Sequence, residues 1–175
     1  MEPVENSLEE NKGFADFIEK YTDAMTKMIV PAKKSKMFPI NNTRALKQFW
    51  SMKAENEPEY KDVPVLLDRL ESSFEKACSQ ATLEEIETAL EKTKTTIGEL
   101  SGKVSLANKT ISENNLGHRA AVGNDPEAAR DYRDANSECE QIIGECEAQL
   151  IVYEEVKKSL SNLYDIKKDD KPHKM

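Results

Sequence analysis

The chain has 175 residues, of which 33% are charged and 6% aromatic, and its formal net charge is -8. A chain of this length can bury a core without disulfides or metals, and we expect one unit. The high charge and the small aromatic, glycine and proline content favour a helical protein over a β-sandwich or barrel. The acidic balance repels nucleic acid and anionic membranes, so binding to either would require a local basic patch.

No long uncharged apolar run occurs, so no transmembrane span is predicted. The first residues, Met1 to Glu5, are acidic and lack an apolar segment, which argues against a secretory signal. Three cysteines, Cys78, Cys139 and Cys146, are an odd number with no metal-binding spacing, and we interpret them as small core residues. We therefore expect a cytoplasmic protein that uses no cofactor and no metal ion.

The N-terminal part of the chain is expected to be a flexible acidic segment, residues 1–12, followed by a helix over about 13–30. An apolar stripe supports this helix, with Phe14, Ile18, Tyr21, Met25 and Met28 at helical spacing. Pro31 is expected to end it. The connector that follows contains Lys33, Lys34 and Lys36, which form either a solvated loop that complements the helix C-terminus or a contact for an anion.

A second, short helix is predicted over about 43–54, capped by Asn42 or Thr43. It contains Phe49 and Trp50, the latter being the only tryptophan of the chain. These two aromatic residues are either buried core anchors or anchors for a partner, since tryptophan is prominent in binding hot spots. The candidate partner-binding residues are Phe49, Trp50, Met25 and Met28, the methionines being adaptable contact residues.

Two helices follow, over about 62–79 and 82–113. We place a kink or break near Gln80 to Thr82, although neither glycine nor proline enforces it. Thr82 and Glu85 have the spacing of a capping box at the start of the second of these helices. Its apolar seam repeats in steps of three and four residues: Leu83, Ile86, Leu90, Thr93, Ile97, Leu100, Val104, Ala107 and Ile111. Gly98 and Gly102 lie on the outside of this helix, where they could mark a bend.

The last helix is predicted over about 126–167, with Asp125 as its cap and Pro126 at its first position. Gly117 is expected to end the preceding helix in a left-handed conformation. The predicted seam of the last helix contains Tyr132, Ala135, Cys139, Ile142, Cys146, Gln149, Tyr153, Val156, Leu160 and Leu163. Residues 168–175 are expected to form a disordered charged tail.

These elements predict an all-α fold: a single elongated helical bundle over 13–167, with three to four helices built on a long antiparallel helical hairpin. The connector between the two long helices is long enough for the chain to fold back. Leu150 to Tyr153 is apolar on nearly every side, which one partner helix cannot cover. The helices near 13–30 and 62–79 are therefore expected to pack over the hairpin.

Catalytic chemistry has little support in the sequence. The two histidines, His118 and His173, lie in a connector and in the tail, so a triad or a histidine-rich metal cage is not expected. A phosphate-binding glycine loop, a nucleophile elbow and the Glu-x-x-His pattern of di-iron bundles are all lacking. We expect a protein that is not an enzyme.

Three hypotheses for function follow. The first is a non-enzymatic protein-protein interaction module, an adaptor or structural subunit whose partner is another protein or a second copy of the chain. The second is a membrane-associated, crescent-shaped helical dimer that binds anionic lipid through the basic loop from Lys33 to Lys36. The third is an acidic inhibitor that mimics nucleic acid. Nucleic acid itself is disfavoured as a partner by the net charge.

Overall fold

The structure, a computed structural model, describes residues 13–170 and contains no strand among them. The segment 1–12, and 171–175 of the predicted tail, lie outside the described residues. The helices are α2 (Phe14–Lys34), α3 (Thr43–Asn56), the single-turn 3-10 helix η1 (Pro58–Tyr60), α4 (Asp62–Gln80), α5 (Leu83–Ala121) and α6 (Pro126–Asp169). The predicted all-α fold on a long antiparallel hairpin is confirmed.

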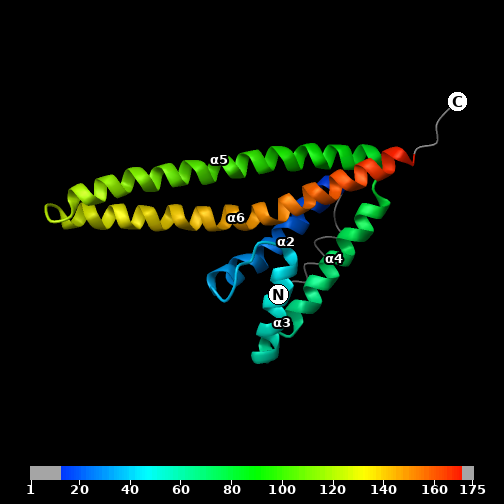
Figure 1. Cartoon of the computed structure of the whole chain (residues 1–175), viewed down its shortest axis with the longest axis horizontal. Helices are drawn as coiled ribbons and strands as arrows, with labels where there is room; N and C mark the ends of the chain where they lie inside the picture. The colour runs from blue at the N-terminus through cyan, green and yellow to red at the C-terminus, as the bar shows by residue number, and fades with distance from the viewer. Residues whose placement is uncertain (1–12, 171–175) are drawn as a thin grey trace.

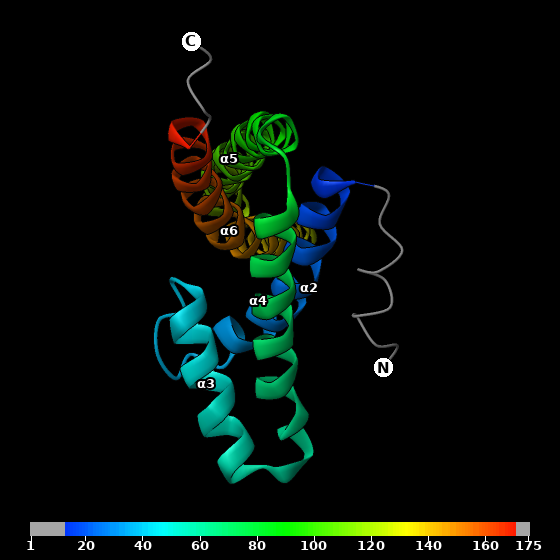
Figure 2. The same cartoon turned by 90° about the vertical axis from the view of Figure 1, so that its right-hand side faces the viewer.

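Helices α5 and α6 run antiparallel along the whole length of the molecule and form the hairpin (Figure 1). Helices α3 and α4 form a shorter antiparallel pair that diverges from it, and α2 lies between the two pairs (Figure 2). The main core lies where these elements meet. Its fully buried side chains include Met25, Ile29, Leu46, Leu67, Leu70, Ile86 and Leu160.

Helix α6 has two buried faces, as the apolar run from Leu150 to Tyr153 implies. Tyr153 and Cys146 pack with Leu100 of α5, whereas Val152 belongs to the main core with α2. The expected cover by α2 is thus present. Helix α4 packs on α2 and α3 instead of lying along the hairpin, and this differs from the predicted bundle.

The predicted seam of α6 is wrong at Ile142. Ile142 is 45% exposed, while its neighbour Ile143 is half-buried. Leu150 packs with Leu100, and Gln149 is half-buried. An apolar pair such as Ile142 and Ile143 fits two seams that differ by one residue. Ile143 takes the more buried place in this pair, whereas Cys146, Tyr153 and Leu160 of the predicted seam are buried as expected.

Pro31 does not end α2, which continues to Lys34. A proline inside a helix removes one backbone hydrogen bond and disturbs the preceding turn. In this turn the indole N–H of Trp50 donates a hydrogen bond to the Met28 carbonyl at 3.1 Å, and Ala32 beyond the proline is fully buried. These tertiary contacts offset the lost helical bond.

Two other predicted helix ends also move. Gly117 lies inside α5, where a Cβ would come within 2.5 Å of the Tyr132 ring, so this glycine permits close packing of the two helices. The left-handed residue is Gly123, with φ of 90°. At the other end of the hairpin, Lys168 and Asp169 belong to α6 and not to a disordered tail.

The break between α4 and α5 is confirmed. Thr82 and Glu85 form the predicted capping box, with hydrogen bonds of 3.2 and 2.8 Å. The Lys167 ammonium group of α6 donates to the carbonyl of Cys78 at 3.3 Å, and also to those of Ser79 and Ala81. A cation at the carbonyl end of α4 stabilises the break and ties it to the end of the hairpin.

Candidate functional site

The four candidate partner-binding residues are buried in the core. Met25 is fully buried, and Met28, Phe49 and Trp50 are at most 7% exposed. The Trp50 ring packs edge-on against Phe49, with 5.1 Å between ring centroids, and lies 5.6 Å from the ring of Tyr60. Their core interpretation is the one that the structure supports, because an anchor for a partner must be accessible.

The three candidate anion-binding lysines lie beside carboxylates. Lys33 forms an ion pair with Glu147 of α6 at 3.5 Å. Lys33, Lys34 and Lys36 together line a hollow of about 520 Å³ whose opposite wall on α6 includes Glu140 and Glu145. The nearby negative charge offsets that of the lysines, which disfavours an anion site there. The anion contact stays a prediction.

A groove of about 780 Å³ runs along α6. Its floor is one helical face, because the lining residues of α6 recur every three or four positions from Glu147 to Ser161. Leu150 and Ile151 are half-buried in the middle of this floor. We call this depression the α6 groove; it is lined by Lys33, Asn41, Asn42, Glu147, Leu150, Ile151, Glu154, Glu155, Lys157, Lys158 and Ser161.

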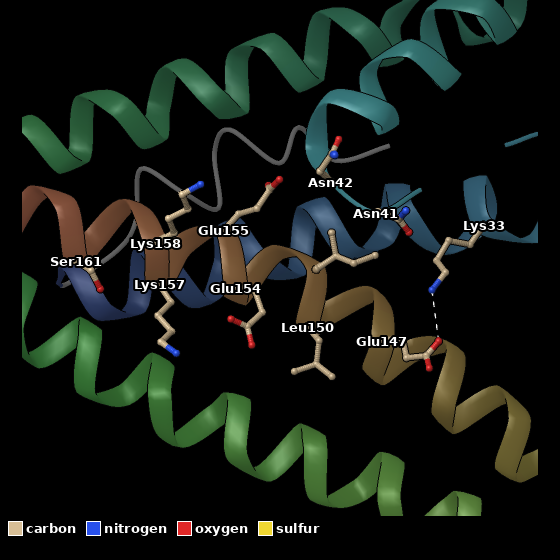
Figure 3. Close-up of a pocket in the computed structure, with 11 residues that line it drawn as sticks. Lys33, Asn41, Asn42, Glu147, Leu150, Glu154, Glu155, Lys157, Lys158 and Ser161 are labelled. Carbon is tan, nitrogen blue, oxygen red and sulfur yellow. Dashed lines mark ion pairs between the residues drawn. The ribbon is translucent and has the colours of Figure 1, made fainter. Parts of the chain in front are cut away.

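Charged side chains leave the floor in two directions. Glu154 and Lys157 extend towards α5, whereas Glu155 and Lys158 extend to the opposite side of α6 (Figure 3). Each side of the groove therefore carries both an acidic and a basic group. An arrangement of this kind has no net preference for an anion or a cation, and it matches a partner that carries both signs.

The α3 side of the groove is rigidly built. The Glu155 carboxylate accepts a hydrogen bond from the backbone N–H of Thr43 at 3.1 Å, and the Asn42 side chain accepts one from Ala45 at 2.8 Å. Both bonds satisfy backbone donors in the first turn of α3 that have no partner within the helix. The Glu155 bond ties the first residue of α3 to α6, whereas the Asn42 bond lies within the cap of α3.

The groove brings amines, carboxylates, amides and one hydroxyl together, and it contains neither histidine nor cysteine. Burial raises the pKa of the Cys78 thiol to about 11. The pKa of the Tyr21 hydroxyl is also raised, mainly by burial and to a smaller extent by the negative charge of Glu71. These two groups are therefore protonated at neutral pH. Across residues 13–170 no three His, Cys, Asp or Glu side chains gather closely enough to hold a metal ion.

Sequence reasoning did not identify the α6 groove. The signal that could have found it is the run from Leu150 to Tyr153, which is apolar on nearly every side. Val152 and Tyr153 are buried in the core, whereas Leu150 and Ile151 pack against its margin and stay half-buried. Only the positions of α2, α3 and α5 determine which half of the run stays accessible.

None of the described helices combines the length and the apolar character needed to cross a membrane. No protein-family model matches the chain, and neither the curated proteins nor the solved structures contain a significant match to it.

Proposed function

We propose that this protein is a non-enzymatic protein-interaction module, an adaptor or structural subunit that binds a helical segment of another protein in the α6 groove. The observation that carries the proposal is the groove floor: an apolar centre, Leu150 and Ile151, on a regular helical face with charges of both signs around it. A helix that lies in an apolar groove uses contacts at the same three- and four-residue steps. The partner segment would be amphipathic, with acidic and basic residues flanking its apolar stripe.

A cytoplasmic location is part of the proposal. All three cysteines are free, and Cys78 and Cys146 are buried. Disulfides are rare in reducing compartments, where free thiols persist.

The test compares the wild-type protein with groove variants in co-purification from native extract. We expect a stoichiometric partner that is lost with Glu154→Arg. Its loss with Leu150→Asp counts only if that variant melts close to wild type, because Leu150 also packs with Leu100. The matched control is Val65→Asp, which places the same charge at a residue of α4 that is 49% exposed. Glu154 is exposed, so Glu154→Arg tests binding without a change in the core.

The identified partner then allows a direct measurement. A synthetic peptide from its binding region should gain helical circular dichroism on mixing with the wild-type protein, and it should not do so with Leu150→Asp. Retention of the same partner by both groove variants, or the lack of any stoichiometric partner, would contradict the proposal.

The lipid-binding alternative has no observation in its favour, because carboxylates of α6 lie beside the lysines of the basic loop. We expect no co-sedimentation with anionic vesicles at physiological salt. Binding that Lys34→Glu abolishes would replace the adaptor proposal with the lipid-binding function.

A further inference from the structure

Helix α5 has an outer face, on the side away from α6, that no other element covers. It consists of residues at three- and four-residue steps, all exposed: Thr95, Glu99, Gly102, Leu106, Lys109 and Glu113. At 3.6 residues per turn these positions fall within a sector of about 100°, opposite the seam that contains Leu100 and Ala107. Helix α5 lies at the edge of the molecule in both views (Figures 1 and 2).

The outer face contains features that intrachain packing does not explain. Gly98 and Gly102 lie in the middle of a long helix, where glycine is less stable than alanine. A Cβ at either position would meet nothing within 4 Å, in contrast to Gly117, which the Tyr132 ring requires. Leu106, one turn after Gly102, is 65% exposed. The lack of a side chain at Gly102 leaves a small notch on this face, beside the exposed Leu106. Both features suit contact with a second molecule.

The outer face is complementary to itself when two copies run antiparallel. With a two-fold axis close to residue 104, Leu106 lies opposite the partner's Gly102, and Glu99 lies opposite the partner's Lys109. The symmetry repeats each contact, so two leucines enter two notches and two ion pairs form. A parallel pairing would instead place Glu99 against Glu99 and Lys109 against Lys109. Charge thus selects the antiparallel arrangement.

The rest of α5 is compatible with this register. Lys94, which pairs with Glu91 of its own helix at 3.4 Å, would lie near the partner's Glu113. Leu116 would lie opposite the partner's Lys92, which pairs with Glu19 of α2 at 3.3 Å. No like charges face each other along the described helix. Helix α6 would be a poor surface for the same purpose, because its half near the hairpin tip is strongly acidic.

We propose that the outer face of α5 is a homodimer interface, in which a second copy packs antiparallel with Leu106 in the Gly102 notch and Glu99 on Lys109. The α6 groove lies outside this interface, so the dimer does not depend on the proposed function. The face from Thr95 to Glu113 spans about 28 Å. One helix pair of this length buries less surface area than the interface of a permanent dimer. We therefore expect a reversible equilibrium between monomer and dimer.

The test is a charge-reversal cycle measured by sedimentation equilibrium over a concentration series. Glu99→Lys and Lys109→Glu should each weaken the dimer about tenfold or more, because each places like charges together at two symmetric sites. The double variant Glu99→Lys/Lys109→Glu restores opposite charges and should return the dissociation constant to near the wild-type value. All three variants change exposed residues, and their thermal melts check the fold.

Glu138→Lys is the matched control, since Glu138 is exposed on α6 and its reversal changes the net charge by the same amount as Glu99→Lys. It should leave the dimer intact. The proposal is overturned if the wild-type protein is monomeric up to its solubility limit. It is also overturned if the single reversals leave the dissociation constant unchanged, or if the double variant stays as weak as the single ones.

Discussion

Replacing Trp50 tests whether this residue is a core anchor or a contact for a partner. The surroundings of its side chain set the expected loss of stability. The side chain is 6% exposed, packs against Phe49 and Tyr60, and donates its indole hydrogen bond to the Met28 carbonyl. Truncation of a buried tryptophan to alanine costs about 3–5 kcal/mol. Small domains have about 5–15 kcal/mol in total, so Trp50→Ala should lose a large fraction of the free energy of unfolding.

Trp50→Phe separates packing from hydrogen bonding. Phenylalanine retains most of the apolar contact but removes the indole donor to the Met28 carbonyl, at a cost of about 0.5–1.5 kcal/mol. Guanidinium unfolding should be followed by circular dichroism at 222 nm, because both variants lose the only tryptophan fluorescence. Met52→Ala, at a residue of the same helix that is 44% exposed, is the control. A loss below about 1 kcal/mol in Trp50→Ala would refute the core assignment.

Three further predictions follow from the hairpin and its base. Leu100→Asp should melt far below wild type because it buries a charge, whereas Ile142→Asp should melt close to wild type; equal losses would mean that the seam of α6 is misplaced. Lys167→Met removes the donor at the end of α4 and should speed amide exchange there, in contrast to the adjacent Lys168→Met; equal exchange in the two would contradict this role. The urea midpoint of unfolding should fall as pH rises from about 9 to about 11, because the buried Cys78 thiol resists ionisation and the unfolded thiol does not. The Cys78→Ala variant should show a smaller fall. If its pH profile is identical to that of the wild type, Cys78 is not the cause.

The sign of the pH effect follows from the raised pKa of Cys78. Below about pH 9 the thiol is protonated in both the folded and the unfolded chain, so it contributes no pH dependence. Between the two pKa values the unfolded chain alone releases the proton, and the folded state loses stability. Tyr21, whose pKa is also raised by burial, acts in the same direction at higher pH.

Local sequence determined most of the secondary structure. The capping box at Thr82, the cap and proline at the start of α6, and the apolar repeats all act within a few residues of where they occur. These signals located the five helices and the break before α5. They also implied that α6 needs cover on more than one side.

Only the tertiary structure decided the helix ends at Pro31 and Gly117, the burial of Ile143 in place of Ile142, and which apolar residues are accessible. Trp50 bonds to the turn before Pro31, and Tyr132 requires the glycine at 117. Both contacts join residues far apart in the chain, so no local pattern reveals them. The same reason explains the site residues: an amphipathic stripe shows that a face is apolar, but the element packed on that face determines whether it becomes core or groove.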